Sequence, residues 1–157
     1  MRRLALILSI SFLLARAADG TPVIFVVRHA EKASAGGNDP DLSVAGQKRA
    51  ETLARILRDS QITSVFVTEF KRTQKTAAPT ANAAHIELTD VPATDVAGLV
   101  TILLALNGNA LVVGHGTPIP DLMTALGLPP PTPISEDNFL DIFLLPLVAP
   151  PPTSRPP

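Results

Sequence analysis

The sequence contains no cysteine, tryptophan or tyrosine, and its six phenylalanines are its only aromatic residues. Without cysteine, both disulfides and thiolate metal sites are excluded. A core must therefore be built mainly from alanine, leucine, valine and isoleucine, within a composition that is 46% hydrophobic. At 157 residues the chain is long enough for one domain with a substantial buried core.

Long apolar runs are also scarce, apart from one at the amino terminus. The basic start, residues 1–3, precedes an apolar stretch over 4–15, and Ala15-Arg16-Ala17 has the small-x-small pattern of a signal-peptidase site. The stretch is shorter than the ~20 residues that span a bilayer. We therefore predict a signal peptide over 1–17, an exported domain over 18–148 that is periplasmic or secreted, and no stable membrane insertion after cleavage. An uncleaved amino-terminal anchor is the alternative.

The chain has no basic excess that would suit a nucleic-acid partner. Cleavage after residue 17 would remove three arginines and no acid, which leaves 10 basic and 14 acidic side chains and a formal charge of −4. An acidic domain lacks the field that neutralises nucleic-acid phosphates. Any positive charge that serves function must be local. The proline-rich segment 149–157 is incompatible with a helix or an interior strand and is expected to be a disordered tail.

Strand-like and helix-like segments alternate along the rest of the chain. Strands are predicted over 23–27, 62–68, 85–88, 110–113 and 139–145, and helices over 43–58, from 72 onward, 94–106 and 118–126. Pro79 should limit or interrupt the second helix, and Pro146 should end the last strand at a sheet edge. This alternation predicts a three-layer α/β/α sandwich with a mainly parallel sheet.

Charged and imidazole groups follow three of these strands at their carboxyl ends. Arg28 and His29 end the first run, Arg72 comes just after the second, and His115 follows the fourth. Ligands of open α/β sheets bind outside the carboxyl ends of the strands, so these side chains should converge on one crevice. Two arginines and two imidazoles around one crevice indicate an anion site, most plausibly for a phosphoryl group.

The same residues carry a resemblance to a known family. The motifs Arg28-His29-Ala30-Glu31, Leu42-Ser43-x-x-Gly46, Arg72-Thr73-x-x-Thr76-Ala77 and Gly114-His115-Gly116 occur in this order. In this order they resemble the histidine phosphatase superfamily, the phosphoglycerate-mutase-like proteins, over nearly the whole domain from Val23 to about Leu145. The resemblance implies a phosphoglycerate-mutase-like fold and a small phosphorylated substrate.

The resemblance also implies a role for each group. His29 would attack phosphorus and carry a phosphohistidine intermediate, while Arg28 and Arg72 would hold the phosphoryl oxygens. His115 would complete the pocket and add positive charge if protonated. Such catalysis needs no cofactor and no metal. The short loops resemble those of the compact branch that includes phosphohistidine phosphatases and favour a phosphatase over a mutase.

The proton donor is the point at which the sequence departs from the family pattern. Gly116 follows His115, so the acid that one branch carries there is missing. Asp90, in Leu88-Thr89-Asp90, loosely matches the Leu-x-Glu pattern of the other branch, and Asp95 is a second candidate unless it only caps a helix. Glu31 is a third candidate, although the family more often uses this position as a hydrogen-bonding partner near the substrate pocket.

Simpler interpretations of these residues stay open at this point. Arg28 could pair with Glu31 or Asp41, and Arg72 could be part of a solvated basic helix start. The two histidines could be buried structural groups, or could hold a metal with a carboxylate, although flanking arginines would repel a cation.

Two further residues and two other functions complete the alternatives. Glu69 has the features of a surface charge, and His85 those of a structural or exposed residue. The protein could also be a phosphate-binding module of the cell envelope with little catalytic power, or a purely structural envelope protein. Composition and motifs leave the physiological substrate and the oligomeric state open.

Overall fold

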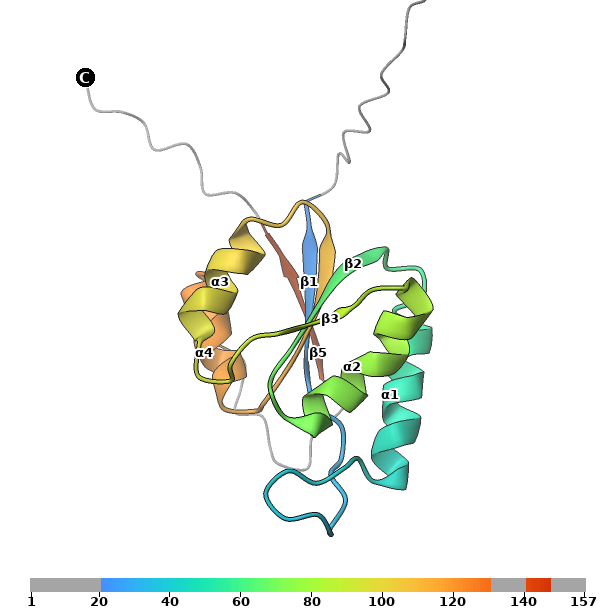
Figure 1. Ribbon diagram of the computed structural model, residues 1–157. Coiled ribbons are helices and arrows are strands. Elements are labelled where there is room, and N and C mark those ends of the chain that lie inside the picture. Colours follow the sequence, from blue (N-terminus) through green and yellow to red (C-terminus); the bar gives the residue numbers. More distant parts are fainter. Residues whose placement is uncertain (1–20, 131–140, 148–157) are drawn as a thin grey trace, which may run out of the picture.

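The computed structural model describes residues 21–130 and 141–147, which form nine helices and strands (Figure 1). The predicted signal peptide and proline-rich tail lie outside the described residues. The elements follow one another as β1 (Val23–Arg28), α1 (Val44–Ile56), β2 (Ile62–Val67), α2 (Lys71–Ala84), β3 (Leu88–Asp90), α3 (Val96–Leu104), β4 (Asn109–Gly114), α4 (Pro118–Ala125) and β5 (Ile142–Pro146).

The five strands form one sheet in the order β3-β2-β4-β1-β5. β1 and β2 both pair in parallel with the central β4, and β3 pairs in parallel with β2. β5 is antiparallel to β1 and lies at the edge, where Pro146 needs no partner for a backbone N–H. The predicted α/β fold with a mainly parallel sheet is therefore confirmed.

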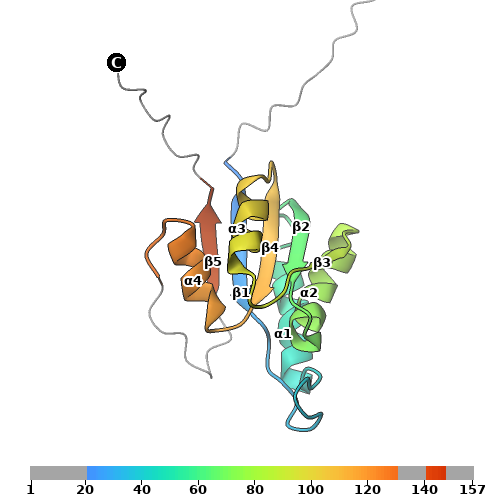
Figure 2. The ribbon, with the colours of Figure 1, turned by 60° about the vertical axis from the view of Figure 1, so that its left-hand side comes forward.

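Helices cover both faces of the sheet, so the sandwich has three layers (Figure 2). Successive strand residues point to opposite faces, which divides the core into two clusters. Phe25, Val27, Leu111 and Val113 pack with residues of α1 and α2. Ile24, Val26, Ala110 and Val112 pack instead with residues of α3 and α4. Strands buried on both faces explain the continuous apolar runs in the sequence.

Two local predictions were wrong. Pro79 does not interrupt α2, which continues to Ala84. One face of α2 is buried, and this packing continues the helix past the proline; its buried residues are Thr73, Thr76, Ala77, Thr80 and Ala81. His85 does not begin a strand. It ends α2 in the left-handed conformation with φ of 56°, and β3 starts only at Leu88.

Candidate active site

The parallel register brings the two motif histidines together. Arg28 lies opposite Gly114 in the β1–β4 pair, and the His29 N–H donates to the Gly114 carbonyl at 2.9 Å. The next residue on each strand is then His29 or His115. Their rings meet edge to face, with centroids 5.3 Å apart and planes at 63°. The convergence expected from strand polarity is therefore present in the structure.

His29 is held in one tautomer by its own loop. Its Nδ1 lies 2.8 Å from the carbonyl oxygen of Ala30, and the residue is only 4% exposed. A carbonyl oxygen only accepts, so Nδ1 carries the hydrogen and Nε2 of the neutral ring carries the lone pair. Burial, together with the nearby His115 and arginines, lowers the pKa of His29 to about 4, although the hydrogen bond to Ala30 raises it. The ring is therefore neutral at pH 7, with the lone pair on Nε2.

A buried threonine ties this loop to α2. The Thr76 hydroxyl accepts from the Ala30 N–H at 2.9 Å and donates to the Arg72 carbonyl at 2.6 Å. Thr76 is 3% exposed and Ala30 is fully buried. One hydroxyl therefore links the backbone after His29 to the helix turn that carries Arg72.

Arg72 is packed rather than solvated. Its guanidinium carbon lies 4.1 Å from the centroid of the Phe70 ring, and that ring meets His115 at 90° with centroids 5.4 Å apart. Arg72 also lies 3.8 Å from Asp39 of the loop after β1. Its Nε is buried without a hydrogen-bond partner among the described residues. These contacts fix a cation beside both imidazoles and argue against a solvated helix start.

Arg28 lies beside the second histidine motif. A Cβ at Gly116 would lie 3.6 Å from the Arg28 Nε, so the Gly116 backbone runs next to the guanidinium. Arg28 and Arg72 both lower the pKa values of both histidines. The carboxylates suggested as simple partners for Arg28 bind other cations, Glu31 pairing with Arg49 and Asp41 with Lys75.

His115 closes a chain of hydroxyl groups. Its Nε2 lies 3.1 Å from the Thr68 hydroxyl, which lies 3.0 Å from that of Thr73. The Thr73 hydroxyl donates to the Phe70 carbonyl at 2.8 Å. Burial, followed by the field of Arg72, lowers the pKa of His115 to about 4, so this ring is neutral at pH 7 as well. The positive charge that the resemblance allowed for it is absent in this form.

The helix α1 is fitted closely to the loop after His29. Ser43 caps α1 by accepting from the Gly46 N–H at 3.0 Å. A Cβ at Gly46 would lie 2.3 Å from the Glu31 carbonyl oxygen, so only glycine allows this approach. The Glu31 carboxylate binds Arg49 of α1 through both oxygens, which lowers its pKa. These contacts suit a structural partner better than a proton donor.

The candidate acids lie in different surroundings. The exposed Asp90 accepts from the Gln74 side chain at 3.2 Å, and Asp95 caps α3 through the Gly98 N–H at 2.9 Å. Glu69 accepts from the Ala93 N–H at 3.0 Å and lies near enough to His115 to raise the pKa of that ring. Among the described residues, the exposed Glu69 is the carboxylate whose charge acts on His115.

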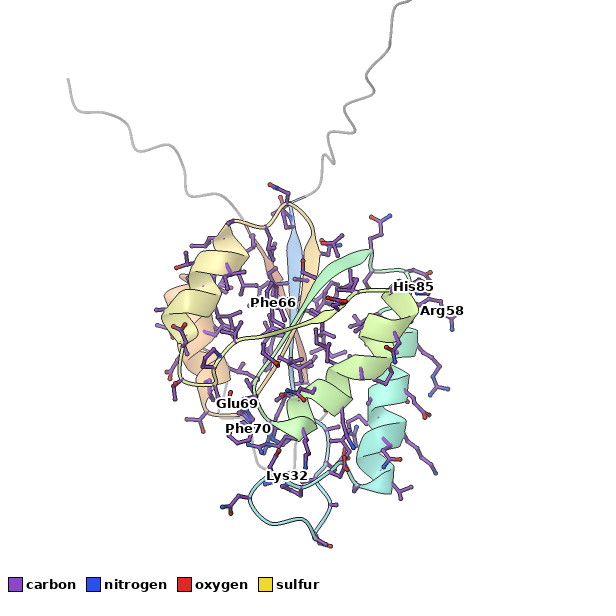
Figure 3. All side chains as sticks on the ribbon, viewed as in Figure 1. Lys32, Arg58, Phe66, Glu69, Phe70 and His85 are labelled. Atoms are coloured by element: carbon purple, nitrogen blue, oxygen red, sulfur yellow. The ribbon has the colours of Figure 1, made fainter. Side chains whose placement is uncertain are left out.

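Glu69, exposed as a surface charge should be, and Lys32 both lie near His115, and neither was among the predicted site residues. Figure 3 shows them with Phe70 at the end of the sheet where the histidine loops lie, while Arg58 and His85 lie at the opposite end of α2. The Lys32 charge helps to lower the pKa of His115. Both residues lie just beyond a strand, β2 or β1, and that position was the available signal.

Residues 21–130 and 141–147 contain no group of three histidine or acidic side chains placed to hold a metal ion. In the same part of the chain, none of the helices has the length and apolarity needed to cross a membrane.

Comparisons with known proteins point to one family. The sequence model of the histidine phosphatase superfamily (branch 1) matches residues 24–95, which include Arg28, His29 and Arg72. No curated protein matches the sequence.

Solved structures share the fold. The protein histidine phosphatase SixA in complex with tungstate is 23% identical, with a TM-score of 0.62 over 70% of this chain and 81% of its own. A mycobacterial glucosyl-3-phosphoglycerate phosphatase is 17% identical, with a TM-score of 0.58 over 69% and 81%. A mycobacterial hydrolase is 18% identical, with a TM-score of 0.59 over 69% and 82%. The matched sequence segment and the shared fold support the histidine phosphatase superfamily as the family of this chain.

Proposed function

We propose that this protein is a phosphatase that hydrolyses a phosphoric monoester through a phosphohistidine intermediate on His29, without a metal ion. The observation that carries the proposal is the Nδ1 bond of His29 to the Ala30 carbonyl, which leaves the Nε2 lone pair on a neutral, buried ring. The names of two similar structures, a protein histidine phosphatase and a glucosyl-3-phosphoglycerate phosphatase, support the same chemistry.

In the first step, His29 Nε2 attacks phosphorus and the bond from phosphorus to the ester oxygen breaks. Arg28 and Arg72 hold the phosphoryl oxygens, and their fixed charges stabilise the transition state. His115 completes the pocket, with its ring held by the Thr68 hydroxyl. The products are the N-phosphorylated ring and the departing alcohol, whose oxygen takes one proton from an acid.

That acid is a carboxyl group near His115. Asp90 is the candidate suggested by sequence, and its carboxylate accepts from Gln74, whose side chain also donates to the Thr68 carbonyl. Glu69 has the stronger structural support, because its charge acts on His115 and its carboxylate reaches the Ala93 backbone. We therefore place Glu69 ahead of Asp90 as the proton donor.

In the second step, water attacks the phosphorus of phosphohistidine and the nitrogen–phosphorus bond breaks. The carboxylate that gave its proton to the alcohol takes one from this water. Inorganic phosphate leaves, and His29 returns to its neutral state. The site then has the protonation state with which it began.

We also propose that the reaction takes place outside the cytoplasm, on the basis of the amino-terminal segment. Amino-terminal sequencing of the protein recovered from its expressing cell would test this, with Ala18 expected as the first residue.

The enzymatic proposal is tested with phenyl phosphate in the presence of excess chelator. Release of inorganic phosphate, together with an alkali-stable and acid-labile phosphoprotein during turnover, is the expected result. Phosphate binding without turnover over a broad panel of esters and phosphoramidates would support a binding module instead. Loss of activity on chelation, restored by a metal, would overturn metal independence.

A further inference from the structure

A second, apolar cleft opens beside the two histidines. It runs between the carboxyl ends of β2 and β4 on one side and α3 and α4 on the other, and its walls include Val91, Val96, Leu99, Pro118 and Ile119. Water-sized groups can be centred over only about 40 Å³ of it, so it is narrow.

The cleft adjoins the paired histidines, because Gly114 and His115 belong to its lining. His115 presents one side of its ring to His29 and also forms part of the cleft wall. The cleft therefore lies next to the position of a phosphorus atom held at His29.

The polar groups of the cleft already have partners. The Asp95 carboxylate caps α3, and the Thr68 hydroxyl lies in the chain between Thr73 and His115. None of the cationic side chains that surround the histidines belongs to the cleft lining. The cleft therefore matches a slender apolar group and offers little to the hydroxyls of a sugar or another polyol, which would lose hydrogen bonds to water on entering.

We propose that this cleft binds the leaving group of the substrate, and that the substrate class is phosphoric monoesters of slender, uncharged, apolar alcohols. The inference rests on the proposed function for the position of phosphorus at His29. Charge complementarity determines which end of the substrate lies in the cleft. The dianionic phosphoryl end meets Arg28 and Arg72, and the apolar end meets the walls formed by α3 and α4.

Alkylphosphonates test the cleft without requiring turnover. They keep the anionic head and vary the apolar tail from methyl to butyl. We expect the dissociation constant, measured by calorimetry on the full chain, to fall by up to about fourfold per added methylene, the factor for full burial at about 0.8 kcal/mol. A dihydroxypropyl tail should bind more weakly than a propyl tail of the same length.

Two variants locate the effect on the cleft. Val96→Phe places an aromatic ring in its wall and should reduce the ratio of methyl to butyl dissociation constants towards one. Leu104→Phe is the matched control on the same helix, because Leu104 is 61% exposed and lies outside the cleft. It should keep the ratio of the unsubstituted protein. Leu99→Ala removes wall contacts without overpacking the cleft. It provides a second test of the ratio of dissociation constants if Val96→Phe fails to fold.

The two proposals fail in different ways. Equal affinities for methyl- and butylphosphonate in the unsubstituted protein would overturn the cleft assignment, whatever the activity. A chain-length effect that Val96→Phe and Leu99→Ala leave intact would overturn it as well. Failure to hydrolyse phenyl phosphate would overturn the proposed function, while the phosphonate series would still report on the cleft.

Discussion

At the carboxyl ends of the parallel strands, the two faces of the sheet carry different kinds of side chain. On the α2 side, buried threonine hydroxyls connect the backbone of the His29 loop, Arg72 and His115. On the α3–α4 side, the cleft walls are mostly valine, leucine, isoleucine and proline, and the polar atoms are engaged in capping or in the hydroxyl chain. His115 belongs to both sides, which we call the polar half and the apolar half of the site.

The difference separates two tasks. A charged phosphoryl group requires donors held in place before it arrives, because reorganisation during reaction would raise the barrier. The buried hydroxyls Thr68, Thr73 and Thr76 perform this fixing. An apolar group requires only surface removed from water, which is not directional. Changes in the polar half should therefore affect the rate of reaction, and changes in the apolar half should affect which ester is bound.

The largest effect should come from breaking the polar half at the nucleophile. His29→Ala removes the only atom proposed to bond to phosphorus, so we expect turnover to fall by about 10³-fold or more. His115→Ala should slow catalysis strongly while still allowing slow phosphorylation of His29. Steady-state kinetics, circular dichroism and trapping of the phosphoprotein are the measurements.

The matched control is His85→Ala at the exposed end of α2, which should retain full activity. If folded His29→Ala keeps more than a few per cent of the activity, His29 is not the nucleophile.

The proton donor should give the next largest effect. Glu69→Gln should slow alkyl phosphates by about 10²-fold, the usual range for general acids, and should affect an aryl phosphate much less because phenolate leaves without help. Asp90→Asn is the paired comparison, with a smaller effect expected, because the carboxylate of Asp90 lies beside Gln74. Rates on butyl and phenyl phosphate for both variants would decide between them.

A loss confined to Asp90→Asn would restore Asp90 as the donor. Equal losses on alkyl and aryl esters would indicate a structural role for the residue concerned.

Two buried threonines of α2 allow a comparison, because the hydroxyl of Thr76 is hydrogen-bonded and that of Thr80 is not, within the described part of the chain. Thr76→Val would leave the buried Ala30 N–H without a partner, so we expect a loss of about 1–3 kcal/mol in unfolding free energy and about tenfold in kcat/KM. Thr80 is equally buried, but its hydroxyl has no partner among the described residues, so Thr80→Val should be neutral or stabilising. Urea unfolding measures the first quantity and steady-state kinetics the second. Equal destabilisation by both would remove the special role of Thr76.

The sequence predicted the fold and the convergence of Arg28, His29, Arg72 and His115, because apolar runs and strand polarity are both local signals. It did not predict the hydroxyl chain, since Thr73 and Thr76 act through partners 5 and 46 residues away. Pro79 was misjudged because a local rule took no account of the packing that continues α2.

The apolar half could not be predicted from the sequence either. Val91, Val96 and Leu99 follow the same pattern as residues that fill the core, and only the placement of α3 and α4 leaves space beside His115. Glu69 was taken for a surface charge, because the turn that brings its carboxylate to Ala93 depends on how β3 lies along β2.

The last prediction, and the one that sharpens the comparison most, concerns pH. Burial lowers the pKa values of His29 and His115 from 6.5 to about 4, so about 90% of each ring should stay neutral at pH 5, against about 3% of an unperturbed imidazole. The unfolded chain takes up protons as the pH falls through 6.5, but the folded site does not until about pH 4. Unfolding free energy should therefore decline between these values. Ring resonances followed by NMR would measure both pKa values, and His29→Ala should show a shallower decline in urea unfolding. Titration of both rings near 6.5 would mean that water reaches them from the apolar half, which would contradict the dry, narrow cleft on which the division of the site depends.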